Sequence, residues 1–537
     1  MSESQAAVCK LSEIRDGEMK EVQAGTTPVL LARIDGKCYA IGAHCTHYGA
    51  PLAEGALSGN RIVCPWHHAC FNAENGDLEE PPAFDSLPNY PVRIEGDDIF
   101  VDVSDPGADR RTPEMTEPDP AVDTRIFVII GGGASGYMAA QTLREDGFKG
   151  RIVMVTLENR RPYDRPNLSK DYLHGHAEAE WIPLRSDEFF DEHGIEILFE
   201  KEVTAVDAEE KIVEFADGES LRYDSLLVAT GGIARKLDLP GSDLKNIFVL
   251  RTFDNADEII ASATKAKRAV VIGASFIGME AAYSLRERGL DVTVVAPDAV
   301  PFEKTLGAEI GEFFQHLHEK HGVKFRLGEQ VTGFDGDAAV RSVLLGSGDR
   351  IETDLVLVGI GVRPATGFLR GMDLRKDGGV VADGHLRIGE GLYVSGDIAY
   401  FPDARTGESV RIEHWRTALQ QGRTAAHNMA GKPATFSAVP FFWTTQFDAT
   451  LNYVGHAKDW AEIIIQGDVA KQDFLAFYVK DHKVLAVAGM NRDRDLAFIE
   501  ELIRLNRMPP LHELRENSLN FSTGSIDSTN YAPRRVL

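Results

Sequence analysis

Two stretches of the chain follow the same plan, in which a continuous apolar run leads into a glycine-rich turn and then into a helical pattern. They are RIFVIIGGGASG at residues 125–136 and RAVVIGASFIG at residues 268–278. A run that is apolar throughout is typical of a parallel strand buried on both faces. Two such units in one chain predict an α/β region with a pair of dinucleotide-binding modules.

The first turn has the features of a dinucleotide site. Gly131, Gly133 and Gly136, with Ser135 between them, allow a tight turn in which backbone N–H groups and the helix N-terminus approach a pyrophosphate. Glu158 ends the next strand, where a carboxylate can accept hydrogen bonds from an adenosine ribose. We therefore predict that these five residues bind a cofactor.

The second turn departs from the pattern in two places. Gly273 and Gly278 are present, but Ser275 stands where the second glycine is usual, and its Cβ restricts close backbone approach. After the next strand Ala296 stands where an acid is common, and Asp298 follows two residues later without an arginine to meet a 2′-phosphate. This favours NADH over NADPH. The alternative for both turns is a Rossmann-type turn that binds nothing.

Cysteine placement separates the two parts of the chain. All five cysteines lie in the first 70 residues: Cys9, Cys38, Cys45, Cys64 and Cys70. Clustered cysteines in a chain without a secretory signal favour metal binding over a disulfide framework. The remainder of the chain also lacks the cysteine pair that a disulfide-reducing flavoprotein needs beside its flavin.

The metal ligands come in two groups. Cys45-Thr-His47 is followed, after sixteen residues, by Cys64-Pro-Trp-His67. A Rieske [2Fe–2S] cluster needs two thiolates on one iron and two imidazoles on the other. Zinc in a Cys2His2 site is the alternative, although zinc fingers usually group their cysteines together and their histidines together.

The flanking residues CTHYGAPL and CPWHHACFN resemble the cluster loops of Rieske ferredoxins. Ala50 stands where high-potential Rieske proteins have a loop cysteine, which implies a lower potential suited to accepting electrons from a flavin. His68 stands where glycine is common, and we interpret it as a local variation that does not bind metal. Cys70 could pair with Cys9 or Cys38, but a buried free thiol is the better expectation.

Composition excludes several function classes. A formal net charge of −26 argues against binding to duplex nucleic acid or an anionic membrane, because both are polyanions. The N-terminus lacks the pattern of a secretory signal, and no apolar stretch is long enough for membrane insertion. We expect a soluble, cytoplasmic protein, and a homodimer is compatible with the sequence.

The 537 residues allow several domains. We predict an N-terminal all-β Rieske domain, then an α/β flavoprotein reductase of the glutathione-reductase kind, and a C-terminal α+β domain. The last domain contains a hairpin at residues 473–490 and a helix that has Leu496, Ile499, Leu502 and Ile503 on one face. The expected bounds are 1–104 for the Rieske domain, 105–124 for a linker, 125–245 and 365–435 for an FAD-binding domain, 246–364 for an NAD(H)-binding domain and 436–537 for the C-terminal domain. The tail from Asn517 is expected to be loosely ordered.

Several further motifs carry a family resemblance. They are PYDRPNLSK, LLVATGG, GIGVRP, LYVSGDIA, EHWRTALQQGRTAA and VPFFWTTQFD. Residues 125–510 resemble the FAD-dependent ferredoxin reductases of oxygenase systems and the apoptosis-inducing-factor family. The whole chain resembles the Rieske-containing branch of that family, the apoptosis-inducing factor 3-like proteins.

This resemblance implies roles for particular residues. Lys170 would form an ion pair with Glu280 beside the isoalloxazine, where a cation stabilises the negative charge of reduced flavin. Trp415 would lie over the nicotinamide, and with Lys170 and Glu280 it completes the predicted catalytic set. Trp443 would lie near the pyrimidine end of the flavin, although plain core packing is the alternative. The remaining expected cofactor contacts are Arg165, Thr230, Gly231, Gly361 and Asp397.

The predicted function is electron transfer from NADH through FAD to the in-chain cluster, with His47 and His67 carrying electrons outward to a protein acceptor. The linker would let the cluster domain dock on the reductase or swing towards another partner. Two alternatives remain open: a reductase of a quinone or other small molecule, and a redox-sensing signalling protein whose slow NADH oxidation sets a conformational state.

Overall fold

The computed structural model describes residues 7–104, 108–516, 519–521 and 534–535. The chain divides into two compact units. The terminal unit comprises Met1–Glu114, Ser437–Trp443 and Leu451–Leu537, so it unites both ends of the chain. The central unit comprises Met115–Phe436 and Thr444–Thr450.

The N-terminal part of the terminal unit is built of short strands in three antiparallel sheets, ordered β2-β3-β4-β9, β5-β6-β7-β8 and β1-β11-β10. The strands are β1 (Cys9–Lys10), β2 (Glu18–Ala24), β3 (Thr27–Ile34), β4 (Lys37–Gly42), β5 (Ala56–Ser58), β6 (Arg61–Val63), β7 (Cys70–Asn72), β8 (Leu78–Glu80), β9 (Asn89–Tyr90), β10 (Val92–Glu95) and β11 (Asp98–Val101). This confirms the predicted all-β region.

The C-terminal part of the terminal unit has a sheet ordered β34-β35-β38-β37-β36. The predicted hairpin is present as β37 and β38, and the four residues predicted for one helix face are all buried on α9. Most of the tail from Asn517 lies outside the described residues. The elements are β34 (Phe441–Gln446), β35 (Ala449–Gly455), β36 (Glu462–Asp468), β37 (Asp473–Lys480), β38 (Lys483–Met490), α9 (Asp493–Arg504), α10 (Leu511–Arg515), β39 (Leu519–Asn520) and β40 (Arg534–Arg535).

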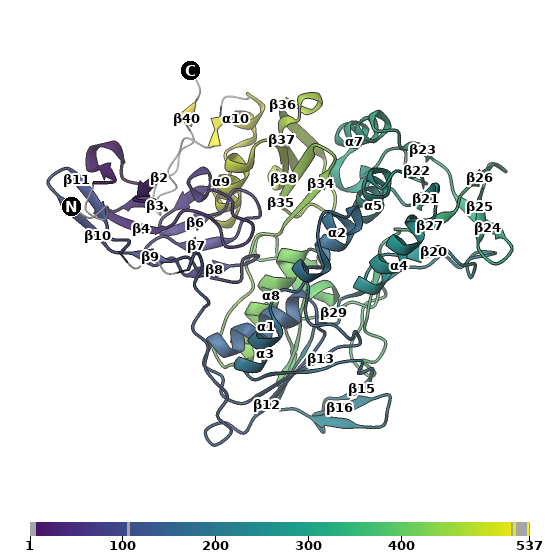
Figure 1. Ribbon diagram of the computed structural model, residues 1–537, viewed down its shortest axis with the longest axis horizontal. Coiled ribbons are helices and arrows are strands. Elements are labelled where there is room, and N and C mark those ends of the chain that lie inside the picture. The colour runs from purple at the N-terminus through teal and green to yellow at the C-terminus, as the bar shows by residue number, and fades with distance from the viewer. Residues whose placement is uncertain (1–6, 105–107, 517–518, 522–533, 536–537) are drawn as a thin grey trace. The chain divides into compact units, whose positions relative to one another are not determined.

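One apolar core joins these two parts of the terminal unit. Ala56, Val63 and Cys70 from β5, β6 and β7 are buried in the same cluster as Leu496 and Ile499 of α9. Figure 1 shows α9 beside β6 and β7, and α9 packs on β5. The sequence did not predict this shared core.

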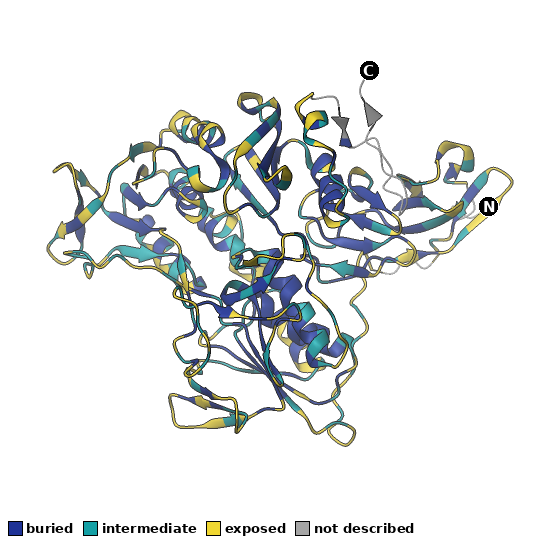
Figure 2. Cartoon of the chain, turned by 180° about the vertical axis from the view of Figure 1, so that it is seen from behind, coloured by how far each residue is buried: buried dark blue, intermediate teal, exposed yellow. Residues whose placement is uncertain are grey.

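The central unit contains two mostly parallel sheets, as the two apolar runs predict. The first has the order β14-β13-β12-β18-β31-β30, in which only β30 is antiparallel to its neighbour, and α1 packs against α8. Figure 2 shows the interior strands and these helices as largely buried. The elements are β12 (Ile126–Ile130), α1 (Ala134–Glu145), β13 (Arg151–Val155), α2 (Asp171–His174), α3 (Asp187–Glu192), β14 (Ile195–Leu198), β18 (Ser225–Val228), β30 (Arg387–Gly389), β31 (Leu392–Val394) and α8 (Trp415–Met429).

The second sheet is parallel throughout, with the order β20-β27-β21-β22-β23. Its elements are β20 (Ile247–Val249), α4 (Phe253–Ala263), β21 (Arg268–Ile272), α5 (Phe276–Glu287), β22 (Asp291–Ala296), α6 (Glu303–Leu306), α7 (Ala308–Lys320), β23 (Lys324–Leu327) and β27 (Leu355–Val358). Smaller sheets are formed by β15 (Val203–Asp207), β16 (Ile212–Phe215) and β17 (Ser220–Arg222), by β24 (Val331–Gly336), β25 (Val340–Leu345) and β26 (Arg350–Glu352), by β19 (Gly232–Ala234) and β28 (Val362–Pro364), and by β29 (Val380–Val381), β32 (Ala399–Pro402) and β33 (Ser409–Val410).

The described residues between β11 and β12 contain almost no regular structure, yet residues near both ends of this segment are hydrogen-bonded within their own units. Arg111 exchanges two backbone hydrogen bonds with Ser86 in the terminal unit. The N–H of Thr116 donates to the carbonyl of Arg144 in the central unit. Among the described helices none has the length and apolar composition needed to cross a bilayer.

Candidate functional site

Two loops with similar backbones present the predicted metal ligands. Cys45 begins one loop and its N–H donates to the carbonyl of Ala50; Cys64 begins the other and its N–H donates to Ala69, both at 2.9 Å. The fourth residue after each cysteine has a left-handed backbone, with φ of 77° at Gly49 and 59° at His68. Each loop therefore turns back on itself, and its two predicted ligands lie within the turn.

The four ligands meet in pairs of one kind. His47 Nδ1 and His67 Nδ1 lie 3.2 Å apart, and the thiols of Cys45 and Cys64 share a hydrogen bond. A Rieske cluster needs thiolates together and imidazoles together. The residues present therefore fit a [2Fe–2S] cluster, with the cysteine pair holding one iron and the histidine pair the other.

Burial affects the two kinds of predicted ligand in opposite ways. Burial lowers the pKa of His47 to about 3, which keeps the imidazole neutral and able to donate a lone pair to metal. The hydrogen bond with Cys64, together with burial, raises the pKa of the Cys45 thiol. Iron would reverse that shift, because a coordinating thiol is deprotonated.

Aromatic rings surround the histidine ligands. The ring of Trp443 lies 4.4 Å from that of His67, and Tyr48 lies 4.1 Å from His47 and 5.6 Å from His67, measured between centroids. The family resemblance placed Trp443 near the flavin, and its contact with a cluster ligand was not predicted. His68 is buried and bonds Glu500, which agrees with its interpretation as a residue that does not bind metal.

The first dinucleotide turn joins β12 to α1. At Gly131, with φ of 127°, a Cβ would lie 2.2 Å from the carbonyl oxygen of Ala229, and at Gly136 a Cβ would lie 2.0 Å from the oxygen of Gly131. At Gly133, directly before α1, a Cβ would meet nothing within 4 Å. Ser135 follows inside the helix and is buried. The turn is thus packed tightly against the backbone at Gly131 and Gly136 and is open at Gly133, next to the N-terminus of α1. Pyrophosphate binding at a helix N-terminus requires such an opening.

A chain of polar contacts joins Glu158, the predicted acid of this site, to the predicted flavin contacts. The carboxylate of Glu158 accepts hydrogen bonds from Tyr163 at 2.7 Å and Arg165 at 2.9 Å. Arg165 also donates to the carbonyl of Arg251, whose guanidinium lies 2.8 Å from Asp397. Sequence reasoning missed Tyr163 and Arg251.

Thr230 and Gly231 lie beside the same group. The hydroxyl of Thr230 donates to the carbonyl of Ala365 at 2.8 Å, and a Cβ at Gly231 would lie 3.8 Å from Asp397 Oδ2. The structure therefore brings Glu158, Arg165, Thr230, Gly231 and Asp397 to one region of the central unit.

The Lys170–Glu280 ion pair is present, with Nζ to Oε2 at 2.8 Å. Glu280 is buried and also accepts hydrogen bonds from the hydroxyls of Ser169 at 2.6 Å and Thr444 at 2.8 Å. Neither hydroxyl was singled out from the sequence, although both lie in motifs that carry the family resemblance. Three donors hold this carboxylate and so fix the position of the Lys170 ammonium.

The second dinucleotide turn joins β21 to α5 and repeats the packing of the first. A Cβ at Gly273 would lie 2.3 Å from the oxygen of Gly359, and one at Gly278 would lie 2.1 Å from the oxygen of Gly273. Ser275 is tolerated because its φ is −96°, a value open to any residue, and its hydroxyl points to the carbonyl of Gly359. Gly361 has a φ of 91° and is the last residue of the loop between β27 and β28.

A lysine lies beside the predicted acid of the second site. Lys304 Nζ is 2.6 Å from Asp298 Oδ1. The sequence prediction considered arginines near Asp298 and missed this cation.

Trp415 is half-buried at the first position of α8.

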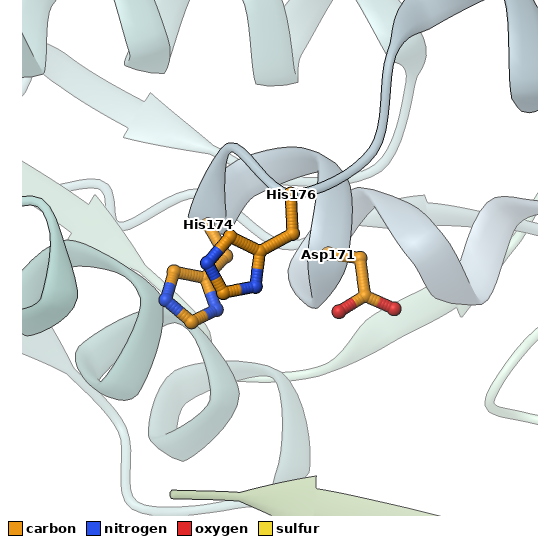
Figure 3. A group of neighbouring side chains, drawn as sticks. All are labelled: Asp171, His174 and His176. Atoms are coloured by element: carbon orange, nitrogen blue, oxygen red, sulfur yellow. The ribbon is translucent and has the colours of Figure 1, made fainter.

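Two other groups of potential metal ligands occur among the described residues. Asp171, His174 and His176 lie at α2 (Figure 3), but the two imidazole rings stack at 3.9 Å and Arg288 lies beside them. Burial and the neighbouring His176 lower the pKa of His174. The second group, Cys70, Glu80 and Glu500, surrounds the guanidinium of Arg61. A cationic side chain therefore already meets the charge requirement there.

Three families match the chain. The Rieske [2Fe–2S] domain matches residues 4–91, the pyridine nucleotide-disulphide oxidoreductase family matches residues 126–422, and the reductase C-terminal domain matches residues 441–523.

Apoptosis-inducing factor 3 of Homo sapiens is 38% identical over 533 residues, which cover 97% of this chain and 87% of that protein. Rhodocoxin reductase of Rhodococcus erythropolis is 36% identical over 69% of this chain and 87% of its own length. Among solved structures, the covalent putidaredoxin reductase–putidaredoxin complex matches with a TM-score of 0.71 and 32% identity, over 74% of this chain and 98% of that one.

The fold, the two dinucleotide turns and the Rieske ligands define an FAD-dependent NAD(P)H oxidoreductase that transfers electrons to an iron–sulfur centre and a protein acceptor. The chain belongs to the Rieske-containing branch of the apoptosis-inducing-factor family of FAD reductases. No cysteine follows Cys70, so it lacks the dithiol after which the pyridine nucleotide-disulphide oxidoreductases are named.

Proposed function

We propose that NADH is the reductant and that the in-chain cluster is the first acceptor of electrons from FAD. Bound FAD supplies an acceptor for two electrons that can release them singly, and a bound cluster supplies a carrier of one electron. The pairing of His47 with His67, and of Cys45 with Cys64, carries this proposal, because it provides a binuclear acceptor in the same chain as two dinucleotide turns.

Lys170 and Glu280 act at the flavin in this proposal. The ammonium of Lys170 stabilises negative charge that develops next to it, and Glu280 holds the ammonium in place. Gly131, Gly133, Ser135 and Gly136 receive the FAD pyrophosphate. Glu158, Arg165, Thr230, Gly231 and Asp397 bind other parts of FAD, and Trp443 acts at the pyrimidine end of the flavin.

The second turn binds the nicotinamide nucleotide. Gly273, Ser275, Gly278 and Gly361 line its phosphates, and Trp415 covers the nicotinamide. Asp298 accepts a hydrogen bond from the adenosine 2′-hydroxyl, which favours NADH, while its ion pair with Lys304 reduces the repulsion of a 2′-phosphate. Asp298→Ala should then reduce the ratio of kcat/KM for NADH to that for NADPH. An unchanged ratio would contradict this assignment.

Rapid mixing of the anaerobic full-length protein with NADH tests the electron path. Flavin absorbance should bleach first, and a reduced Rieske signal should then grow in the EPR spectrum. Bleaching with a silent cluster would contradict the proposal, as would zinc without sulfide in the metal analysis.

Two other functions are distinguished by comparing the Cys45→Ser variant with the unaltered protein. Turnover with one-electron protein acceptors should be lost in this variant. Quinone turnover that survives would favour a small-molecule reductase. Slow turnover by the unaltered protein, with a change of shape or oligomeric state on adding NADH, would favour a redox sensor.

The remaining proposals concern assembly and location. We assign the domain bounds 1–104, 105–124, 125–245 with 365–435, 246–364 and 436–537. A cytoplasmic location is proposed, and a homodimer is the assembly to test by sedimentation of the full chain with and without NADH.

A further inference from the structure

The second cluster loop is anchored by a buried histidine–carboxylate pair. His68 Nδ1 bonds Glu500 Oε2 of α9, and the two side chains are 0% and 1% exposed. The His68 ring also stacks on Phe441 at a centroid distance of 4.1 Å. His68 follows the cluster ligand His67 directly, so this contact holds the loop at its ligand.

A second buried carboxylate, Glu501, fastens the strand that leads into the same loop. Arg61 of β6 donates to Glu501 of α9 at 3.0 Å and to Glu80 of β8 at 2.7 Å. A third donor–acceptor contact, at 2.8 Å, joins Arg61 to the sulfur of Cys70 in β7. Glu501 is fully buried, and Arg504 also binds it. Consecutive carboxylates of α9 therefore hold both sides of the loop.

Such pairs are more informative about position than about stability. Burying two charges is nearly offset by their attraction, so apolar packing of the same volume often stabilises as well or better. Losing one partner, however, leaves an uncompensated buried charge. The buried carboxylates of α9 are therefore paired in one position of the cluster strands on α9, and any other position would leave them unpaired at a cost in free energy.

The same anchoring fixes the environment of a ligand. Trp443 packs on His67, and it lies on β34 with Phe441, which stacks on His68. The shared core of Val63 and Cys70 with Leu496 and Ile499 surrounds these contacts. Side chains therefore pack without interruption from the shared apolar core, through Phe441 and Trp443 of β34, to the predicted ligand His67.

We infer that Arg61, His68, Glu500 and Glu501 are positioning residues that lock the cluster domain onto the C-terminal domain, so that His67 is held against Trp443 in one geometry. The cluster domain does not swing away from the C-terminal domain during turnover, which removes one of the two arrangements that the linker sequence allows. The consequence for electron transfer rests on the proposed function, whereas the locking itself does not.

Hydrogen–deuterium exchange of the full-length protein tests the locking. We compare Glu500→Ala, Glu500→Gln, which keeps an acceptor for His68, and His68→Gly, which keeps the left-handed backbone. Exchange in segments 61–70 and 493–504 should accelerate together in Glu500→Ala and His68→Gly, and by less in Glu500→Gln. Unchanged exchange in both segments, or acceleration in one alone, would overturn the inference.

The matched control is Asp146→Asn, which removes a carboxylate from a histidine in the central unit, where His427 Nδ1 lies 2.6 Å away. It should leave exchange in both segments of the terminal unit unchanged. Acceleration there in this control as well would overturn the inference by showing general loosening.

Single-turnover kinetics tests the consequence in variants with unchanged iron and sulfide. Cluster reduction by NADH should slow about tenfold or more in Glu500→Ala, because misplacement by about 1 Å can reduce a rate by about a hundredfold. Flavin reduction should keep its rate, and Glu500→Gln should restore most of the loss. If Glu500→Ala does not assemble the cluster, His68→Gly replaces it. Wild-type cluster reduction together with altered exchange would overturn the positioning role alone, and loss of flavin reduction would instead count against the proposed function.

Discussion

The two cluster loops have the same backbone turn but opposite surroundings. In the first loop the left-handed position is Gly49, and a Cβ there would meet nothing within 4 Å. In the second it is His68, which is buried against Phe441 and Glu500. The same backbone turn therefore ends in an exposed tip at Gly49 in the first loop, and in a buried, anchored side chain at His68 in the second.

The energetics explain why a histidine is retained at the less favourable position. A left-handed residue other than glycine costs about 1–3 kcal/mol and persists where its surroundings hold it. At His68 the bond to Glu500 and the ring stacking supply those surroundings. At Gly49 no neighbour offers such compensation, so glycine is the favourable residue.

Loss of a thiolate should have the largest effect and should be the same in both loops. Cys45→Ser and Cys64→Ser are each expected to abolish the Rieske EPR signal and the bound sulfide, because each loop supplies one thiolate. NADH should still bleach the flavin. Cys38→Ser is the control, since Cys38 is not a predicted ligand. A normal Rieske signal in either ligand variant would contradict the ligand assignment.

Removing Arg61 should show that the second loop is anchored more firmly than the exposed surface of the same unit. Arg61→Ala leaves the buried Glu501 with Arg504 as its partner and removes the cation beside Glu80 and Cys70. We expect the terminal unit to lose about 3 kcal/mol of unfolding free energy, because buried acceptors lose their donor. Urea unfolding, followed by a probe in this unit, measures the loss. Arg93→Ala is the control, because Arg93 is exposed on β10 and pairs only with exposed Glu95 among the ion pairs described. Equal losses of unfolding free energy in Arg61→Ala and Arg93→Ala would show that Arg61 does not anchor the loop more than a surface arginine does.

Removing an aromatic neighbour of the histidines should sharpen the comparison. Trp443→Ala should destabilise the terminal unit by about 2 kcal/mol, less than the 3–5 kcal/mol typical of fully buried aromatics, because Trp443 is partly buried. Tyr48→Ala should change stability by only about 0.5 kcal/mol, because Tyr48 is 50% exposed. The same unfolding experiment compares them. A larger loss from Tyr48→Ala would reverse the proposed roles of the two loops.

At Gly49, the open tip, the expected effect comes from the backbone conformation alone. Gly49→Ala should cost about 1–2 kcal/mol, because its φ of 77° is unfavourable for a residue with a Cβ, although no atom would clash. Gly49→Asn should cost less, since asparagine adopts this conformation more readily. Equal losses from the two substitutions would point to a steric cause that the structure does not contain.

Local sequence was sufficient where a short segment determines its own geometry. The spacing of Cys45, His47, Cys64 and His67, and the run from buried strand through glycines to helix, each depend on adjacent backbone. The Lys170–Glu280 pair joins distant residues and was predicted only through the family resemblance.

Contacts between distant segments without a repeated motif were not predicted. Nothing adjacent to His68 indicates Glu500, which lies 432 residues further along the chain. The only signal was a histidine at a position where glycine is common. Likewise, Lys304 is near Asp298 because α6 folds back after β22, and the contact of Trp443 with His67 depends on how β34 meets the cluster loops.

The core shared by β5–β7 and α9 has a consequence for how this electron carrier can exist. If the chain were cut after residue 104, the detached N-terminal piece would expose Val63 and Cys70 to water, and Arg61 would lose its Glu501 partner. The remaining reductase would in turn present the bare apolar side of α9. Each fragment would thus expose apolar surface that the intact chain buries, which disfavours exchange of this carrier between reductases in the manner of a diffusing ferredoxin.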